Sequence, residues 1–346
     1  MTSRIVEWSS IGVRDHLPAS IKEKEAVAAI ADNTLWPNLF LIGVPKAGTT
    51  YVSAMLSLHR DIFCSRIKSP NFMNTDVELS DVPLADEIDT DMPLHAAIIR
   101  DEQAYLALYA EGKSSPIRVD CSADYLRSTV AAQNIAMKVP NAKIIAILRN
   151  PIERCLSHYL MDLWIGRPVG TFETEIERHI AAITANEFWG GNYVRTGFYD
   201  EQIERYYARF PEANIKIRLY DDLLREPAAL MTEFFRHVDL DPISVTDIDR
   251  SRLNVAKLPR FHGVNRLFYY TGAKRAFSRF VPQPLKDRLL PFYYTNRVEH
   301  QIPNHIYARL ADIFRDHVIE LSRILDHDLS PWLVGQPIEP LARDTN

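Results

Sequence analysis

The chain has 346 residues, of which 47% are hydrophobic and 25% charged, and its formal net charge is −5. This composition is typical of an ordinary globular protein. The small negative charge excludes a protein whose overall field attracts nucleic acid, so any anion site must be local. The three cysteines, Cys64, Cys121 and Cys155, are far apart in sequence and lack metal-ligand spacing, which predicts reduced thiols.

The N-terminal sequence lacks the apolar core of a signal peptide, and no apolar run is long enough for a membrane span. We therefore expect a cytoplasmic protein with no stable membrane insertion. Residues 1–36 are expected to form a lead-in, residues 37–335 the main domain and residues 336–346 a tail.

The stretch 39–56, LFLIGVPKAGTTYVSAML, contains a short apolar run, a break and a helical pattern. The run predicts a strand buried on both faces, followed by a tight turn and a helix that begins near Thr49. A helix N-terminus offers unpaired amides and a positive dipole end, and Gly48 allows close approach of a phosphate. The stretch therefore predicts a phosphate site formed by consecutive residues, namely Lys46, Ala47, Gly48, Thr49, Thr50 and Tyr51.

A second stretch, 142–159, reads AKIIAILRNPIERCLSHY and predicts another buried strand, over 143–148, followed by a helix. Pro151 suits the first helical position. Three polar side chains are expected on the helix surface: Arg154, Ser157 and His158. The planar guanidinium of Arg149 and the hydroxyl of Ser157 are suited to hold one phosphate together.

These two motifs resemble the donor-binding motifs of sulfotransferases. The order K-x-G-T-T at 46–50 resembles the 5′-phosphosulfate loop, and R-N-P-x-x-R-x-x-S-x-Y at 149–159 resembles the 3′-phosphate motif. The resemblance extends over about residues 38–333 and points to a bacterial-type enzyme related to the heparan-sulfate and small-molecule branch. It implies 3′-phosphoadenosine 5′-phosphosulfate (PAPS) as co-substrate, the spent nucleotide PAP as product, and no metal.

The resemblance also implies a fold and residue roles. The expected fold is α/β, a single P-loop-like domain with a central parallel sheet of four to five strands flanked by helices on both faces. Lys46 would stabilise the leaving phosphate during in-line transfer, and Arg149 with Ser157 would hold the 3′-phosphate. Further donor contacts are expected from three later residues: Tyr199, Lys257 and Arg260.

The sequence does not identify which residue acts as the general base. Relatives with glycan acceptors carry K-E-P-x-F-F, whereas residues 68–73 read KSPNFM here, with Ser69 at the position of the glutamate. A serine does not act as a base near neutral pH without activation. Asp120 and His158 are the leading candidates; Asp76 and His95, in a predicted lid, are others, and a more acidic acceptor would need no strong base. Three residues are expected on the substrate side: Lys68, Ser69 and Asn71.

The acceptor is expected to be a small molecule or a glycolipid precursor that offers a hydroxyl or an amine. Residues 74–116 are expected to form a lid or insertion. Residues 264–300, which are basic and aromatic, are expected to form an acceptor-side helical cap or two amphipathic helices on the core. One alternative is a non-catalytic PAP-binding or PAPS-binding pseudoenzyme, which the retention of Lys46 counts against. Another is a nucleotide kinase-like phosphotransferase, which the lack of GK[ST] counts against.

Overall fold

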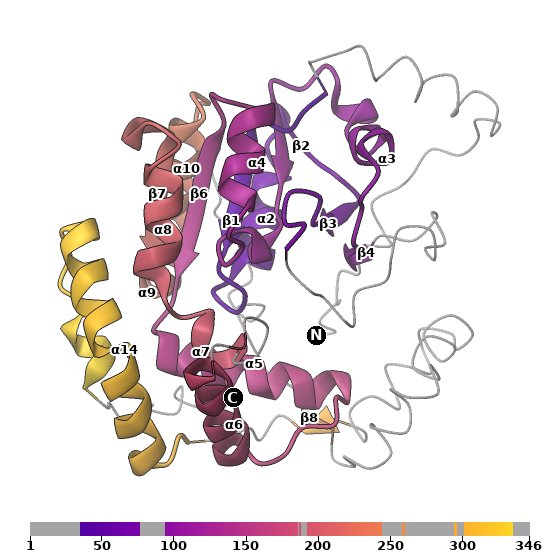
Figure 1. Ribbon diagram of the computed structural model, residues 1–346. Coiled ribbons are helices and arrows are strands. Elements are labelled where there is room, and N and C mark those ends of the chain that lie inside the picture. The colour runs from indigo at the N-terminus through magenta and orange to yellow at the C-terminus, as the bar shows by residue number, and fades with distance from the viewer. Residues whose placement is uncertain are drawn as a thin grey trace, which may run out of the picture. The chain divides into compact units, whose positions relative to one another are not determined.

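The structure is a computed structural model, and it describes residues 35–76, 94–185, 187, 192–243, 258–259, 294–295 and 301–334. The described residues form two compact units (Figure 1). The first contains the residues up to 148 and those from 202 to 243; the second contains 149–201 and the residues from 258 onwards. Several predictions lie outside the described residues: those for nearly all of the lead-in, Lys257, Arg260, most of the 264–300 cap and the tail.

The first unit is built on a five-stranded parallel sheet with the order β2-β5-β1-β6-β7. Its strands are β1 (Leu39–Gly43), β2 (Ile62–Cys64), β5 (Ile117–Asp120), β6 (Lys143–Leu148) and β7 (Ile215–Leu219). Every residue of the central strand β1 is buried, as its continuous apolar run predicts. The predicted α/β fold with a central parallel sheet is therefore confirmed.

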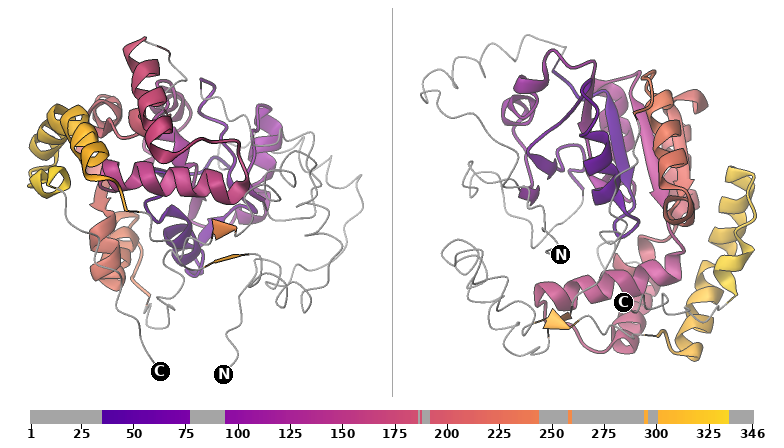
Figure 2. Two further views of the ribbon diagram at one scale, coloured as in Figure 1. Left: turned by 90° about the horizontal axis from the view of Figure 1, so that it is seen from below. Right: turned by 180° about the vertical axis from the view of Figure 1, so that it is seen from behind.

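Helices cover both faces of this sheet (Figures 1 and 2). Helix α2 (Thr49–Leu56) follows β1, and α10 (Pro227–His237) lies on the same face; α4 (Ala131–Lys138) and α8 (Tyr199–Tyr207) lie on the other. The connection from β1 to β2 and that from β5 to β6 run in opposite directions along the sheet, and right-handed crossovers then place their helices on opposite faces. The short helix α9 (Tyr220–Arg225) follows β7 directly.

The described part of the predicted 74–116 insertion contains regular structure. Strand β3 (Ile67–Ser69) pairs in parallel with β4 (Leu94–Ala96), and helix α3 (Glu102–Ala107) follows. Asp101 caps α3, because its side chain accepts a hydrogen bond of 2.8 Å from the amide of Ala104. The remaining short 3-10 turns of this unit are η3 (Ala110–Gly112), η4 (Ala123–Tyr125) and η5 (Glu212–Asn214).

The second unit is mainly helical. It contains α5 (Pro151–Ile165), α6 (Phe172–Thr184), α7 (Asn192–Arg195), the start of α8 and α14 (Asn304–Leu325), followed by the 3-10 turn η7 (Ser330–Leu333). Two short strands, β8 (Leu258–Pro259) and β9 (Tyr294–Thr295), pair antiparallel. No helix among the described residues of either unit has the length and apolarity that crossing a bilayer demands.

Helix α5 begins as predicted and differs from the prediction at one residue. The Asn150 side chain accepts a hydrogen bond of 2.9 Å from the amide of Ile152, and Pro151 occupies the first helical position. Arg154, however, is 0% exposed, so its predicted place on the helix surface is wrong. Its guanidinium donates to the carbonyl of Tyr193, which neighbouring helix α7 brings over α5.

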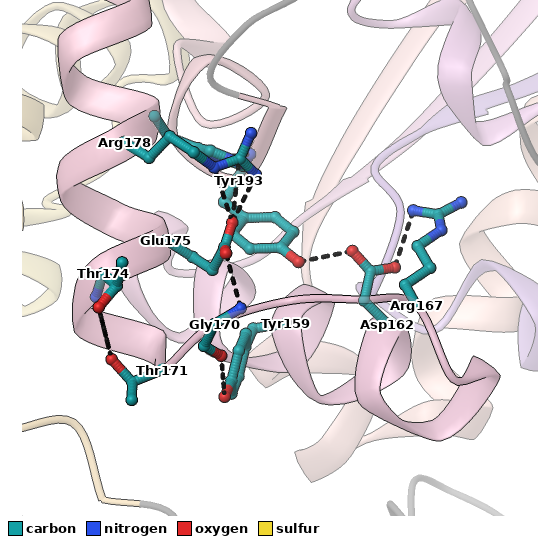
Figure 3. Close-up of polar contacts among 10 residues, drawn as sticks. Tyr159, Asp162, Arg167, Gly170, Thr171, Thr174, Glu175, Arg178 and Tyr193 are labelled. Carbon is teal, nitrogen blue, oxygen red and sulfur yellow. Dashed lines mark hydrogen bonds and ion pairs between the residues drawn. The ribbon is translucent and has the colours of Figure 1, made fainter. Parts of the chain in front are cut away.

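A network of buried polar groups joins the end of α5 to α6 and α7 (Figure 3). Asp162 accepts hydrogen bonds from the Tyr193 hydroxyl, at 2.5 Å, and from Arg167, at 2.8 Å. Glu175 accepts from the amide of Gly170, at 2.8 Å, and from Arg178. These contacts fix the orientation of α5, the helix that carries Ser157 and His158.

A glycine separates two consecutive helices. Gly197 lies between α7 and α8. A Cβ atom on Gly197 would lie 2.6 Å from the Phe314 ring and 2.8 Å from Cβ of Pro151. The close approach of α14 and α5 therefore demands glycine at this break.

An ion pair in the second unit predicts a pH-dependent stability. His317 of α14 lies 2.9 Å from Asp200 and stacks on Phe198, with ring centroids 4.0 Å apart. Burial lowers the pKa of His317, but the Asp200 hydrogen bond and the charges of Asp200, Glu201 and Asp316 outweigh it and raise the pKa overall. The stabilisation is therefore present below pH 6.5, about the pKa in the unfolded chain, and is lost as the pH rises through the folded value.

We expect the free energy of unfolding to fall by roughly 1 kcal/mol from this pair as the pH is raised from about 5.5 to 8.5. Urea unfolding of the wild type and of His317→Gln at both pH values measures it. The substitution should remove the difference, whereas His327→Gln, at an exposed position of the segment after α14, should leave it. The same pH dependence in wild type and His317→Gln would contradict the assignment.

Candidate functional site

The turn between β1 and α2 has the backbone of an anion site. Lys46 and Gly48 adopt the left-handed conformation, with φ of 75° and 82°. A Cβ atom on Gly48 would lie 2.6 Å from a methyl carbon of Leu223, so only glycine is accommodated. The first helical bond joins the amide of Val52 to the carbonyl of Gly48, at 3.1 Å. The three amides before Val52 therefore have no carbonyl partner within α2, the arrangement that binds anions at helix N-termini.

The side chains of this loop differ in exposure. Ala47 and Thr49 are buried, Lys46 and Tyr51 are half-buried, and Thr50 is exposed. All of them lie at the carboxyl end of β1, as the sequence predicts.

The structure brings Lys68 to this loop. Its ammonium group lies 3.4 Å from the Thr49 hydroxyl oxygen and 3.5 Å from the carbonyl oxygen of Cys121. Burial lowers the pKa of Lys68, and the nearby negative charges of Cys121, Asp124 and Asp120 oppose that effect only in part. Lys68 therefore supplies a second cationic group beside the predicted phosphate site.

Ser69 and Asn71 adjoin Lys68, but their polar groups are engaged within the protein. The Ser69 hydroxyl donates to the carbonyl of Cys121 at 3.0 Å. The Asn71 side-chain amide donates to the carbonyls of Ser69, at 2.9 Å, and Ala97, at 3.1 Å. Both side chains are buried, and they hold the segment after β3 in place.

Asp120 is the centre of a buried hydrogen-bond cluster. One carboxylate oxygen accepts from the amide and the hydroxyl of Ser122, at 3.0 and 2.7 Å; the other accepts from the hydroxyls of Tyr105 and Tyr125, both at 2.7 Å. Burial raises the pKa of Asp120, and these hydrogen bonds offset the rise only in part. Four accepted bonds use the full capacity of a carboxylate, an arrangement typical of a scaffold residue. The predicted role as a base stays a prediction.

Asp76 and His95 are the two candidate bases from the predicted lid, and the structure describes the side chain of Asp76 alone of the two. Asp76 accepts hydrogen bonds from the hydroxyl of Ser128 and from the amide and hydroxyl of Thr129. Burial raises the pKa of Asp76, but these hydrogen bonds lower it by a larger amount. The net shift of the pKa is downward, so the carboxylate is a weak base. His95 lies in β4, and its side chain is outside the described residues.

Arg149 immediately follows the last residue of β6, Leu148. Its guanidinium pairs with Glu153 at 3.2 Å, one helical turn away. Its carbonyl accepts a hydrogen bond of 2.9 Å from the hydroxyl of Tyr199. Tyr199, predicted as a donor contact, is buried and uses its hydroxyl to position the backbone of Arg149. Ser157 lies half-buried on α5, two turns on from Arg149.

His158 is held by the buried Arg154. The Arg154 Nη1 and His158 Nδ1 atoms are 3.3 Å apart, and the Tyr193 ring lies 5.0 Å from the His158 ring. A guanidinium only donates hydrogen bonds, so Nδ1 of His158 is the acceptor and the neutral ring carries its proton on Nε2. This tautomer is a hydrogen-bond donor at Nε2, which favours a ligand-positioning role over that of a base. The base role predicted for His158 stays a prediction.

Sequence reasoning missed the partners that surround the predicted residues. These are Tyr105 and Tyr125 around Asp120, and Arg154 beside His158. The spacing of four between Arg154 and His158 signalled contact on a helix, but the two tyrosines come from separate elements and gave no local signal. Within the described part of the chain, no group of three or more histidine, cysteine, aspartate or glutamate residues is placed to hold a metal ion.

Comparison with known proteins agrees with this geometry. Residues 37–244 match the model of a sulfotransferase family. The bifunctional heparan sulfate N-deacetylase/N-sulfotransferase 2 of Homo sapiens is 25% identical over 313 residues, which cover 89% of this chain and 31% of that protein. The heparan sulfate glucosamine 3-O-sulfotransferase 6 of Homo sapiens is 23% identical, covering 75% of this chain and 69% of that protein.

The crystal structure of a sulfotransferase from Alicyclobacillus acidocaldarius shares the fold. It superposes with a TM-score of 0.61 at 22% sequence identity, covering 86% of this chain and 98% of that one. This chain spans about a third of the length of the bifunctional relatives it matches. The family match covers more than half of the chain, and it shows that the chain belongs to the sulfotransferase family.

Proposed function

We propose that this chain transfers the sulfuryl group of PAPS to a hydroxyl or an amine of a small-molecule or glycolipid-like acceptor. The observation that carries the proposal is the loop at 46–51. Its left-handed Gly48, the N-terminus of α2 and the Lys68 ammonium beside Thr49 together suit a phosphosulfate group.

The roles at the loop follow from the charge that develops during transfer. As the sulfuryl group leaves, negative charge grows on the 5′-phosphate, and a fixed cation there lowers the barrier. Lys46 is proposed for this role. Thr49 and Thr50 hold the 5′-phosphate, and Lys68, which lies at Thr49, attracts the sulfuryl oxygens. Positioning donor and acceptor in line supplies the rest of the acceleration.

The 3′-phosphate is proposed to bind Arg149 and Ser157, on the strength of their motif. In the structure Arg149 pairs with Glu153, which is 35% exposed, so a phosphate would compete with this carboxylate for the guanidinium. Buried Tyr199 fixes the backbone of Arg149, which reduces the entropy lost on binding. Lys257 and Arg260 are proposed as further contacts from their family position.

The acceptor class follows from the residues around Ser69. Ser69 stands where a glutamate base is expected, Asp120 has its four acceptor positions filled, and the His158 tautomer is a donor. An amine that is neutral near the working pH, or an acidic hydroxyl, needs little help from a base. Two relatives are named as an N-sulfotransferase and a 3-O-sulfotransferase, which supports testing both acceptor classes. A cytoplasmic location stays a prediction of the sequence.

Calorimetric titration with PAP tests the donor site. We expect wild-type binding in the micromolar range and a loss of affinity of about 10- to 100-fold in Arg149→Ala, because a charged hydrogen-bond partner of the 3′-phosphate is removed. Arg323→Ala is the matched control, since Arg323 is 71% exposed and pairs with Glu320 at the far end of α14. It should bind PAP like the wild type.

Two results would redirect the assignment. Binding of ATP with Mg²⁺ in place of PAP would favour the kinase-like alternative. Tight binding of PAP, with no sulfate transferred from PAPS to a panel of amines, phenols and alcohols, would favour the pseudoenzyme.

A further inference from the structure

Two cysteines that are 57 positions apart in sequence meet beside the proposed donor site. Cys64 ends β2 and pairs with Val119 of β5, and Cys121 is two residues beyond Val119, on the same face of the sheet. Cys64 is half-buried and Cys121 is buried. Their side chains hydrogen-bond to each other, and both reach Ser53 of α2, the Cys64 sulfur at 3.9 Å from its carbonyl oxygen.

The surroundings of the two thiols shift their pKa values in opposite directions. The hydrogen bond from Cys64 lowers the pKa of Cys121; burial opposes this, and the Lys68 charge lowers the pKa again. The same hydrogen bond, together with burial, raises the pKa of Cys64. These shifts make Cys121 the more acidic thiol of the pair and Cys64 the less acidic one. A thiol of lowered pKa beside a second thiol is suited to reversible oxidation to a disulfide.

We propose that Cys64 and Cys121 form a site of reversible oxidation, at which a small peroxide joins the two sulfurs in a disulfide and thereby slows sulfuryl transfer. Cys121 gives up its proton and attacks one peroxide oxygen, the O–O bond breaks, and the hydroxide that leaves takes up that proton as water. The Cys64 sulfur then attacks the sulfenic sulfur of Cys121. An S–S bond forms, the S–O bond breaks, and a second water leaves with the Cys64 proton. Two thiols and one hydrogen peroxide thus give one disulfide and two waters.

The strand register places the two cysteines on adjacent strands, with Cys121 two positions beyond the partner of Cys64. A disulfide requires the two Cα atoms to approach within about 7 Å. Cys121 follows Asp120, the last residue of β5, so it can shift toward Cys64 without breaking a strand hydrogen bond. Oxidation at this position would keep the sheet intact.

The link to the reaction runs through Lys68 and rests on the proposed function. The Cys121 carbonyl accepts from the Lys68 ammonium, at 3.5 Å, and from the Ser69 hydroxyl, at 3.0 Å. A disulfide moves this carbonyl and with it the Lys68 ammonium, which also contacts Thr49. We expect turnover to fall by between about 5- and 100-fold, as for other small displacements of a charged group at a reacting centre.

The experiment treats the full chain with hydrogen peroxide, alkylates the remaining thiols and maps the linked peptides by mass spectrometry. We expect a Cys64–Cys121 link that dithiothreitol reverses. In Cys64→Ser the reaction should stop at a sulfenic acid on Cys121, which dimedone traps. Cys155→Ser should behave like the wild type, because burial raises the pKa of Cys155 to about 11 and keeps it a thiol. No link, or a link that includes Cys155, would overturn the site.

Sulfate transfer measured before oxidation, after it and after reduction tests the second half of the proposal. In the wild type, turnover should fall on oxidation and recover with dithiothreitol. In Cys64→Ser no disulfide can form between these positions, so any recovery of turnover there does not come from reducing one. A reversible disulfide with unchanged turnover would overturn the effect on the reaction. If the reduced protein transfers no sulfate at all, the proposed function fails, whereas the peptide map still decides the oxidation site.

Discussion

Replacing Lys46 by alanine is expected to lower sulfuryl-transfer turnover by about 10²- to 10³-fold, the usual loss when one preorganised charge stabiliser is removed from an active site. The affinity for PAP should change by less than about tenfold, because the N-terminus of α2 and the Thr49 hydroxyl still hold the 5′-phosphate. The reason for the difference is timing: the charge that Lys46 neutralises grows only as the bond to sulfur breaks. Steady-state rates at saturating PAPS and calorimetry with PAP measure the two quantities.

Lys46→Met is the companion variant, since it keeps an unbranched side chain of similar length without the charge. It should resemble the alanine variant, which would separate loss of charge from loss of packing. Lys113→Met, at an exposed position after η3, should have no effect on either quantity. Equal losses of turnover and PAP affinity in both Lys46 variants would mean that Lys46 binds the ground state, and the assigned role would be wrong.

Local patterns were sufficient to predict the parts of the fold that build the donor loop. The apolar run of β1 and the Gly48 turn are encoded within a dozen consecutive residues, and the structure has this strand, turn and helix where the sequence predicts them. Asn150 and Pro151 likewise encode the start of α5. Such elements depend on neighbours in the sequence, and periodicity and capping rules describe those neighbours directly.

Helix α6 was missed although its signals were local. Thr171 caps the helix by accepting from the amide of Thr174, and Glu173 and Glu175 occupy its first turn. These are ordinary start signals. The start of α6 is therefore encoded in its own residues.

The surroundings of the site residues could not be predicted, because they depend on the order of strands in the sheet. Cys64 meets Cys121 only because β2 lies beside β5. The helical pattern placed Arg154 on the surface, since nothing local shows that α7 covers that side of α5. Arg154 in turn fixes the tautomer of His158, so the predicted chemistry of His158 depended on a contact that periodicity does not contain.

The same limitation applies to Asp120, for which we expect a structural rather than a catalytic effect. Asp120→Ala should lower the free energy of unfolding by about 3–5 kcal/mol, because it leaves two buried tyrosine hydroxyls and the amide and hydroxyl of Ser122 without their acceptor. Asp120→Asn keeps the shape and one acceptor oxygen, so it should cost about 1–3 kcal/mol. Urea unfolding measures both.

The asparagine variant also decides between scaffold and base. A general base contributes about 10²- to 10⁴-fold to the rate, and an amide cannot replace it. If Asp120 is a scaffold, the folded Asp120→Asn protein should keep turnover within about tenfold of the wild type, since the position of Lys68 is altered only slightly. Tyr105→Phe removes one donor to the same carboxylate and should cost stability without abolishing turnover. A stable Asp120→Asn protein with turnover lowered by more than about 10²-fold would instead identify Asp120 as the base, and its four hydrogen bonds would then have to rearrange when acceptor binds.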